Sequence, residues 1–390
     1  MLIHEITLRN MLSFGPDTPP LPMRNLNVLI GPNGSGKSNL IEAIGLLRAA
    51  PRHLATAVRE GGGIHDWIWR GKPKATASLD VVVDQPQKTQ PLRHVIQFRE
   101  SAQRFELVGE RIEDAEPTPR QSDSFHPYYK FEDGRAVLKS QCLGSPTKQE
   151  KLQPDELDES ILSRRRDPTA YPQVTWLGWI YERIRLYREW SFGPHTALRQ
   201  PQKADQPNDM LEADALNLGL VLNRLEGQRK AKRHLLENLR ELYDSIDDYH
   251  IQVEGGTVQV FLHESDFPIP ATRLSDGTMR YLCLLAILCN PELPPLVCIE
   301  EPELGLHPDV LPTIAKLLKE ASAKQQIIVT THSDILVDAL TETPESIVVC
   351  EKHEGQTVMR RLEAEKLAKW LEKYRLGNLW TSGEIGGLRW

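Results

Sequence analysis

The spacing of apolar and polar residues divides the N-terminal part of the chain into strands and a helix. Residues 2–9 alternate with a period of two, which is typical of a half-buried strand, and residues 26–30 form an apolar run that predicts a buried strand. Helical spacing covers residues 39–50 and ends at Pro51. Two strands before residue 31 predict a small antiparallel sheet beside the helix. Further strand-like runs cover residues 77–83, 93–99 and 105–108.

The middle of the chain has weak and then helical periodicity. Residues 112–160 are rich in Pro, Asp, Ser and Gln, so we expect loops or partly disordered chain there. Residues 176–249 change toward a helical period, in three runs of which the first includes Tyr187. Two basic stretches, residues 164–166 and 229–233, are either solvated helix faces or contacts to the phosphate backbone of nucleic acid.

Regular alternation returns in the last third of the chain. Residues 251–263 alternate on both sides of a Gly-Gly pair, which predicts a β-hairpin. Two short apolar runs at 296–299 and 326–330 predict buried strands, and a helix is expected between them over residues 309–323. An amphipathic helix is expected over residues 362–376.

Composition adds limits on the class of protein. The 390 residues carry a net charge of −7 with 26% charged residues, which indicates a soluble protein without a globally basic surface, although a local basic patch could still bind nucleic acid. The longest apolar run, residues 281–289, is too short to span a bilayer, and an acid at Glu5 argues against a signal peptide. The five cysteines have no C-x-x-C spacing, as expected in a reducing compartment. We therefore expect a cytoplasmic protein without a membrane partner.

A phosphate-binding loop stands between the strand at 26–30 and the following helix. Residues 31–38 read G-P-N-G-S-G-K-S, which fits G-x-x-x-x-G-K-S, and we call them the P-loop. Its glycines let backbone amides surround one anion, Lys37 would reach the β- and γ-phosphates, and the Ser38 hydroxyl would complete a Mg²⁺ shell. ATP and Mg²⁺ are therefore the predicted cofactors. The predicted nucleotide-binding residues here are Asn33, Gly34, Ser35, Gly36, Lys37, Ser38 and Asn39.

A second anion-binding helix end is predicted near residue 275. Residues 273–278 read R-L-S-D-G-T and open a helix that ends before Pro291; we call them the signature turn. Ser275 is a good N-cap residue, whereas Gly277 in the first turn needs another explanation. A Ser and a Gly that expose backbone amides at a helix N-terminus can bind an anion. This predicted site is separate from the P-loop.

Acidic residues and a histidine follow the two apolar strands of the last third. Glu300 stands at the end of a buried strand, where Mg²⁺ is held; a Glu in place of the usual Asp favours coordination through water. Glu301 is the predicted general base that orients the attacking water. His332 follows the strand at 326–330 and is placed to contact a γ-phosphate. The predicted catalytic residues are therefore Glu301 and His332, and the predicted metal ligands are Ser38 and Glu300.

The order of these motifs resembles the ABC-type ATPase heads of the RecF, SMC and OLD families. The motifs are the P-loop, L-S-D-G at 274–277, E-E-P-E at 300–303, G-L-H-P at 305–308 and T-H-S at 331–333. The resemblance covers residues 1–48 and 272–350 and implies an α/β fold of the P-loop NTPase class. In those families two heads sandwich ATP, so Ser275 and Gly277 would complete the site of a second copy. The two anion-binding helix ends of one domain cannot hold the same phosphate unless the chain folds back. A head-to-tail pair of copies brings one end from each copy to each phosphate, which implies a homodimer or a higher oligomer.

The chain also departs from these families. No Q-loop residue is placed with certainty, and Gln87 and Gln97 are the candidates. Residues 39–273 are too few and too rich in Pro for the coiled-coil arms of SMC proteins, and the short segment after His332 leaves no room for a Toprim domain. The tail at 377–387 resembles the ending of small OLD-like ATPases that are followed by a separately encoded Toprim-like nuclease. It is either a docking strip for such a partner or a disordered terminus.

The motifs predict four parts of the chain. The N-terminal ATPase lobe with the P-loop covers 1–110, and a loop-rich and helical insertion covers 111–250. The C-terminal ATPase lobe covers 251–350 and holds the signature turn, the strand-end acids and the switch histidine. Residues 351–390 form a C-terminal helix and tail.

The predicted function is an ATP-hydrolysing dimeric switch that works on DNA, with a nuclease partner, in DNA repair or anti-phage defence. Two other classes stay open at this point. The first is a scaffold that ATP stabilises without useful turnover. The second, the ATP-binding subunit of a membrane transporter, is disfavoured by the N-terminal strand motif and by the segment that follows the acids.

Overall fold

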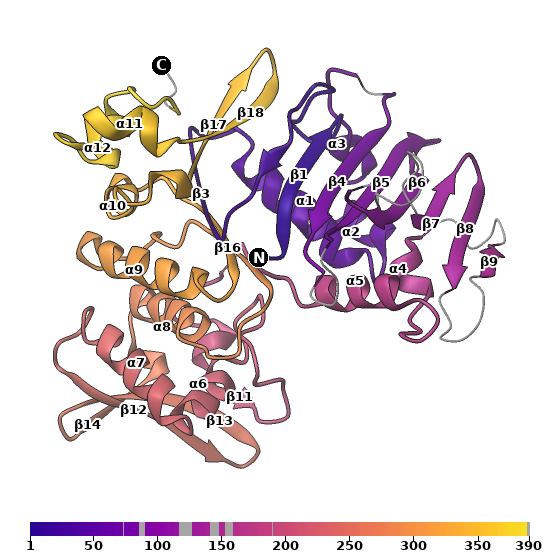
Figure 1. Ribbon diagram of the computed structural model, residues 1–390. Helices are drawn as coiled ribbons and strands as arrows, with labels where there is room; N and C mark the ends of the chain where they lie inside the picture. Colours follow the sequence, from indigo (N-terminus) through magenta and orange to yellow (C-terminus); the bar gives the residue numbers. More distant parts are fainter. Residues whose placement is uncertain are drawn as a thin grey trace.

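An eight-stranded antiparallel sheet forms the first lobe of the computed structural model, which describes residues 1–72, 74–85, 90–116, 127–140, 148–152, 159–188 and 190–387 (Figure 1). The strand order is β2-β1-β4-β5-β6-β7-β8-β9. The strands are β1 (Ile3–Arg9), β2 (Leu21–Pro22), β4 (Ala77–Val83), β5 (Leu92–Ser101), β6 (Arg104–Asp114), β7 (Pro127–Glu132), β8 (Arg135–Ser140) and β9 (Lys148–Lys151).

The sequence prediction for residues 112–160 is wrong over the described part of this segment. Strands β7, β8 and β9 lie there and extend the sheet beyond β6. Buried Tyr129 and Phe131 alternate with exposed positions in the second half of β7, and the preceding Tyr128 is buried as well. The Pro- and Ser-rich flanks hide this short period in the sequence. The helices of this lobe are α1 (Lys37–Ala49), α2 (Leu54–Glu60), α3 (Ile64–Trp67), α4 (Ile161–Arg164) and α5 (Pro172–Glu182).

A six-stranded sheet carries the P-loop strand near its centre. Its order is β10-β15-β16-β3-β17-β18, and all pairs are parallel except β17 with β18. The predicted strands at 26–30, 296–299 and 326–330 are confirmed as β3, β15 and β16. Tyr187, expected in a helix, lies in the parallel edge strand β10. The strands are β3 (Leu26–Ile30), β10 (Arg185–Tyr187), β15 (Leu296–Glu300), β16 (Gln326–Thr330), β17 (Ile347–His353) and β18 (Gln356–Arg361).

A helical lobe with a small antiparallel sheet packs on the other side of the six-stranded sheet (Figure 1). The predicted hairpin is confirmed as β12 and β13, joined at Gly255 and Gly256. The helices are α6 (Leu218–Glu226), α7 (Arg229–Leu239), α8 (Asp276–Leu288) and α9 (Leu311–Ser322). The strands are β11 (Gln202–Lys203), β12 (Ile246–Glu254), β13 (Thr257–Glu264) and β14 (Phe267–Pro270). Single 3₁₀ turns are η2 (Ala197–Arg199), η3 (Ala271–Arg273), η4 (Pro308–Val310) and η5 (Pro344–Ser346).

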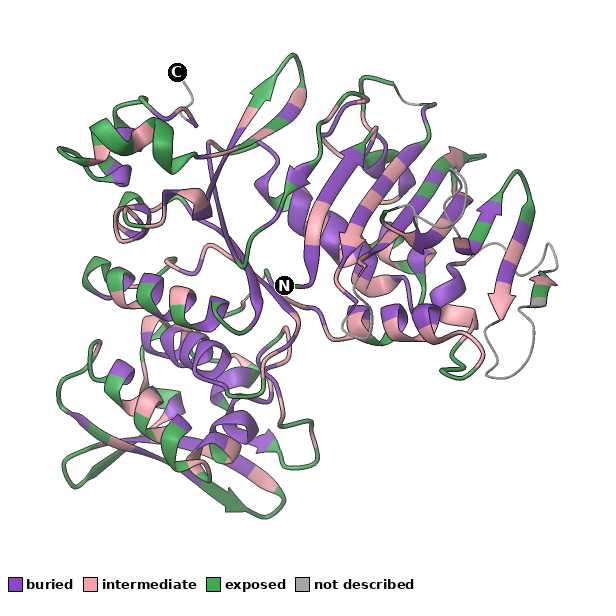
Figure 2. Cartoon of the chain, in the orientation of Figure 1, coloured by how far each residue is buried: buried purple, intermediate pink, exposed green. Residues whose placement is uncertain are grey.

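Two hydrophobic cores meet at the six-stranded sheet. Val28 and Ile30 of β3 face the core of the helical lobe, whereas Leu29 faces the core shared with α1 and the eight-stranded sheet. The strands β3, β15 and β16 are buried along almost their whole length (Figure 2). A sheet covered on both faces needs apolar side chains at successive positions, which explains why these strands read as continuous apolar runs.

The C-terminal segment contains two short helices where the sequence predicts one over residues 362–376. They are α11 (Ala364–Leu371) and α12 (Leu376–Thr381), and α12 packs on α10 (Asp334–Asp338). The amide of Gly377 donates to the Asp338 carboxylate at 2.5 Å, and a Cβ at Gly377 would lie 2.4 Å from the Asp334 carbonyl. This close approach fixes the start of α12 on α10 and separates it from α11.

The four cysteines in the described part of the chain are free and buried, and Cys142 lies outside the described residues. Within the described ranges, no helix combines the length and the apolar character needed to cross a membrane.

The basic stretch in α7 forms ion pairs within the chain. The ammonium of Lys232 lies 3.3 Å from Glu226 and 2.9 Å from Asp248, and Arg233 lies 3.8 Å from Glu237. Lys232 and Arg233 thus have acidic partners within the chain, which is compatible with either interpretation of this stretch.

Candidate nucleotide-binding site

The P-loop connects β3 to α1 through glycines in conformations that other residues rarely adopt. Gly31, Gly34 and Gly36 have φ angles of 144°, 77° and 98°. A Cβ at Gly31 would lie 2.1 Å from the Cys350 carbonyl, and one at Gly36 would lie 2.2 Å from the Thr357 hydroxyl. Glycine is therefore required at both positions for the turn and for the close contact with the β17–β18 hairpin.

Lys37 is folded back over the P-loop. Its ammonium donates to the carbonyls of Gly31 at 2.7 Å and Pro32 at 3.1 Å. Burial lowers the pKa of Lys37, and the charges of Glu301 and Glu300 oppose this shift. The ammonium therefore lies within the loop, where the β- and γ-phosphates would replace these carbonyls as its partners.

A hydroxyl network behind the P-loop comes from residues that the sequence analysis did not assign. The Thr357 hydroxyl of β18 contacts the Ser35 carbonyl at 2.9 Å and the Ser13 hydroxyl at 2.6 Å. The Asn39 amide also donates to Ser13, at 2.7 Å. The buried Ser35 hydroxyl has no hydrogen-bond partner among the described residues. Thr357 has no sequence signal of its own, because only the pairing of β18 brings it to the loop.

Ser38 and Glu300 are close together at the carboxyl edge of the sheet. The Ser38 hydroxyl lies 3.2 Å from a carboxylate oxygen of Glu300, the last residue of β15. A hydroxyl and a carboxylate are hard oxygen donors of the kind that Mg²⁺ prefers. The orphaned Ser35 hydroxyl and the tight glycine cradle also fit a nucleotide phosphate. The residues present thus fit both predicted cofactors.

Arg188 is a site residue that the sequence analysis missed. Its Nε donates to Glu300 at 2.8 Å, and its guanidinium lies 3.9 Å from Glu42 of α1. Arg188 directly follows β10, which pairs with β15 in parallel. The sequence analysis predicted a helix for this segment. Only a strand that pairs with β15 places the following residue, Arg188, at the carboxyl edge of the sheet.

Glu301 and His332 lie next to each other beyond the ends of β15 and β16. The His332 Nε2 is 3.6 Å from a Glu301 carboxylate oxygen. Glu301 has a φ of 46°, and its amide donates to the Thr330 carbonyl at 3.0 Å. Burial lowers the pKa of His332, Lys37 lowers it further, and Glu301 opposes the shift. A neutral imidazole at neutral pH can accept or donate a hydrogen bond.

Glu303 positions the histidine and was not assigned from the sequence. One carboxylate oxygen accepts hydrogen bonds from the Thr331 hydroxyl and from the His332 amide, both at 2.7 Å. Its other oxygen is buried and has no partner among the described residues. The E-E-P-E motif contains this residue, but the spacing of the motif does not show which of its acids hydrogen-bonds to Thr331 and His332.

The signature turn forms the N-terminus of α8. The Ser275 hydroxyl accepts from the Thr278 amide at 3.1 Å, which confirms the N-cap. A Cβ at Gly277 would lie 2.7 Å from the Gly305 carbonyl, so close packing against the loop after Glu301 explains this glycine. The buried Arg199 side chain holds the turn by donating to the Ala271 and Leu274 carbonyls and to the Asp276 carboxylate.

Ser275 is exposed, and its hydroxyl contacts Thr278 of its own helix. In the described ranges, no hydrogen bond joins Ser275 or Gly277 to residues 31–38. Of the two Q-loop candidates, Gln97 is an exposed residue of β5 and Gln87 lies outside the described residues.

A cavity of about 640 Å³ lies beside the first turn of α1. Its volume is within the range of small-ligand sites. The residues that line it include Ser13, Asn39, Trp69, Arg70, Lys352 and Gly355.

Comparisons with known proteins agree with this geometry. The family described as "AAA domain, putative AbiEii toxin, Type IV TA system" matches residues 26–338. The chain is 26% identical over 119 residues to the chromosome partition protein Smc of Mycolicibacterium paratuberculosis and to that of Mycobacterium tuberculosis. These matches cover 28% of this chain, which spans about a tenth of each relative.

Solved structures of Smc heads have a similar fold. An Smc head bound to the C-terminal winged-helix domain of ScpA has a TM-score of 0.56 at 16% identity, covering 95% of this chain and 100% of that one. An Smc head with an extended coiled coil, bound to the C-terminal domain of ScpA, from Pyrococcus furiosus, has a TM-score of 0.54 at 15% identity, with 96% and 99% covered.

The chain belongs to this AAA ATPase family, which matches more than half of it. Its fold is that of an SMC-like, ABC-type ATPase head of the P-loop NTPase class. Membership in a P-loop ATPase family implies nucleotide binding, usually with Mg²⁺.

Proposed function

We propose that the protein is an ATP-dependent dimeric switch in which two copies sandwich ATP head to tail. The observation that carries this proposal is the division of the site. The P-loop, Glu300, Glu301 and His332 gather at one sheet edge, whereas the exposed Ser275 contacts none of them by a hydrogen bond within the described chain. A second copy would bring its signature turn to the open side of the P-loop.

Each residue of the proposed site has a task that follows from its position. Lys37 and the loop amides hold the phosphates, while Ser38 and Glu300 would hold Mg²⁺, which when bound neutralises charge on the phosphates. Glu301 accepts a proton from the water that attacks the γ-phosphorus as the bond to the β-phosphate oxygen breaks. His332, held by Glu303, hydrogen-bonds to the γ-phosphate and couples its loss to the strand-end loops. Asn33 and Gly34 contribute loop amides.

The switch acts on DNA or on a partner nuclease, in repair or anti-phage defence, in the cytoplasm. The head in one similar structure is bound to a winged-helix domain of ScpA, a separate protein, which supports a separate partner here as well. A Toprim-like nuclease docked on the C-terminal segment is one such partner, since Trp370 of α11 and Tyr374 just after this helix are 44% and 50% exposed. ATP closes the two heads and hydrolysis reopens them, so the nucleotide controls access to the partner surface.

One observation favours a second function, a scaffold that ATP stabilises without useful turnover. Arg188 holds one carboxylate oxygen of Glu300, at 2.8 Å, and so reduces the negative charge that Glu300 can offer to Mg²⁺ at its other oxygen, beside Ser38. If the pair persisted in the ATP-bound protein, ATP would hold the assembly together without rapid hydrolysis.

Replacing Glu301 by Gln tests the proposal. The Gln side chain keeps the shape but cannot accept the proton, so turnover should fall by about 10²-fold or more. With ATP and Mg²⁺ this variant should elute as a stable dimer in size-exclusion chromatography with light scattering. Glu365→Gln, at an exposed position of α11, is the matched control and should behave as wild type.

The outcomes separate the two functions. A monomeric Glu301→Gln protein at saturating ATP would contradict the sandwich. A dimer with equal, very slow turnover in wild type and variant, with and without DNA, would indicate the scaffold.

A further inference from the structure

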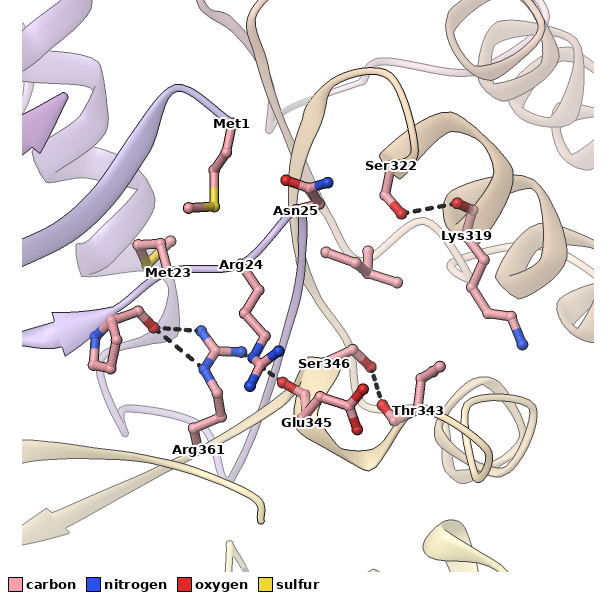
Figure 3. Close-up of a pocket in the computed structure, with 12 residues that line it drawn as sticks. Met1, Met23, Arg24, Asn25, Lys319, Ser322, Thr343, Glu345, Ser346 and Arg361 are labelled. Carbon is pink, nitrogen blue, oxygen red and sulfur yellow. Dashed lines mark hydrogen bonds between the residues drawn. The ribbon is translucent and has the colours of Figure 1, made fainter. Parts of the chain in front are cut away.

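A second pocket lies at the opposite end of β3 from the P-loop (Figure 3). It has a volume of about 660 Å³ and is formed by the residues before β3, the C-terminal end of α9, η5 and the last residue of β18. Met23 and Leu26 give it an apolar wall, and Arg24, Lys319 and Arg361 give it a basic one. Ligands of parallel sheets usually bind at the carboxyl edge, so this amino-edge pocket is outside the nucleotide site.

Arg361 is a half-buried cation whose hydrogen bonds all go to neutral oxygens. Its guanidinium donates to the Pro22 carbonyl at 2.8 Å and 3.2 Å, to the Asn27 side-chain oxygen at 2.7 Å and to the Glu345 carbonyl at 2.9 Å. Among the described carboxylates, none lies within ion-pair distance of it. Buried charges in proteins are normally paired. The Arg361 guanidinium is therefore unusual, because it lacks a counter-ion within the described chain.

Arg24 adds a second positive charge at the same place. Its exposed side chain has no hydrogen bond or ion pair to any part of the chain that the structure describes. Burial and the charge of Arg24 together lower the pKa of Arg361 to about 10, and Glu345 opposes the shift. Figure 3 shows the Arg24 and Arg361 side chains among the residues that line the pocket, together with Glu345. The chain thus keeps two like charges together where repulsion is not offset by a direct ion pair.

We propose that this pocket binds a small organic anion through Arg24, Arg361 and Lys319. The anionic group is a carboxylate or a phosphate monoester, because guanidinium groups bind both through charge-assisted hydrogen bonds. The body of the ligand is at least partly apolar, since Met23 and Leu26 form the facing wall. The pocket volume is that of typical small-molecule sites.

The surroundings disfavour an extended polyanion such as DNA. Glu345 lines the pocket, Glu342 lies 3.8 Å from Lys319, and Glu363 and Glu365 line the adjoining surface recess. These acids would repel a nucleic-acid backbone, which carries a phosphate at every nucleotide. A single anion inside the pocket needs only the arginines and Lys319.

Site-resolved protection of Arg24 tests the proposal on the full chain. Phenylglyoxal modifies exposed guanidinium groups, and peptide mass spectrometry gives the rate at each arginine. Millimolar inorganic phosphate or acetate should slow modification of Arg24 by about fivefold, because the bound anion covers the guanidinium. Arg104 is the internal control, since it is exposed and has no ion pair in the described structure. Whichever of phosphate and acetate protects at lower concentration identifies the anionic group.

Two variants sharpen the measurement. Lys319→Met should raise the half-protecting concentration about threefold, and Glu345→Gln should lower it by a similar factor, because they remove a cation and an anion from the same pocket. Equal protection of Arg24 and Arg104, no protection, or protection by a DNA duplex alone would overturn the proposal. So would an unchanged half-protecting concentration in both variants. Phosphate held by the P-loop cannot mimic the result, because Arg24 is at the other end of β3.

Discussion

The N-termini of α1 and α8 carry similar residues in different surroundings. Each has a Ser and a Gly within the first turn and backbone amides that can bind an anion. At α1 the glycines pack against the β17–β18 hairpin and Lys37 is 6% exposed. At α8 the Ser275 side chain is exposed and satisfies its own helix amide, while Arg199 holds the turn from behind.

This difference suggests that the two helix ends contribute unequally to one composite site. The end of α1 is an enclosed cradle in which a phosphate can displace carbonyls from Lys37 without help from another chain. The end of α8 is held by the hydrogen bonds of Arg199 and faces solvent, which suits a preformed surface that completes the site of another copy. Rigidity matters because a preformed surface loses little conformational entropy on binding.

The largest effects should come from breaking each helix end separately. Lys37→Ala should weaken ATP binding by about 10- to 100-fold, because it removes charge-assisted hydrogen bonds to the phosphates. Ser275→Arg should leave ATP binding to the monomer unchanged but abolish the ATP-dependent dimer and reduce turnover by about 10²-fold. Calorimetric titration with ATP and light scattering would measure both quantities.

Both variants should fold, which circular dichroism can check, because Ser275 is exposed and Lys37 bonds only to loop carbonyls. Weakened ATP binding in the Ser275→Arg monomer would show that the signature turn acts within its own chain. The inference that the end of α1 binds ATP alone, while the end of α8 completes the site of another copy, would then be wrong.

A smaller effect is expected at Arg188, on the metal side of the cradle. The Arg188–Glu300 pair is partly exposed, at 34% and 17%, so it contributes about 1 kcal/mol after screening. Arg188→Met should release Glu300 and lower the Mg²⁺ concentration needed for half-maximal ATP-dependent dimerisation by about fivefold. The change is measured by light scattering over a Mg²⁺ titration.

Arg166→Met is the matched control. Arg166 makes a similar ion pair, with a distance of 2.9 Å to Glu182, and this pair does not involve the P-loop. An unchanged or higher Mg²⁺ requirement in Arg188→Met would mean that Arg188 assists the metal site instead of competing with it.

The sequence predicted the central sheet and the motif residues because both depend on local patterns. Residues 26–30 and 326–330 are strands with the predicted bounds, since a strand buried on both faces is apolar at nearly every position. The proximity of Ser38 and Glu300 also followed, because parallel strands place their carboxyl ends at one edge.

Residues without a local pattern could not be predicted. Tyr187 and Arg188 read as helix because three-residue β10 is too short to show a period of two, and only its pairing with β15 defines it. Thr357 reaches the P-loop through a hairpin more than three hundred residues away in the sequence. The sequence shows only that Gly277 is unusual in a first helical turn, because the Gly305 carbonyl that packs against it lies on another segment.

The smallest predicted effect is a change in the titration of His332, which reports the charges around the cradle. Burial and the nearby Lys37 lower the pKa of His332 below 6.5, while Glu301 raises it. Lys37→Met should therefore move the pKa of His332 upward, and Glu301→Gln should move it downward, in the nucleotide-free protein. Both shifts are measured from the imidazole NMR signals of His332. A shift of the same sign in both variants would mean that rearrangement of the strand-end loops, and not charge, sets the His332 pKa. In that case the 3.6 Å contact between His332 and Glu301 would not persist in solution, and the histidine would respond to nucleotide through loop movement.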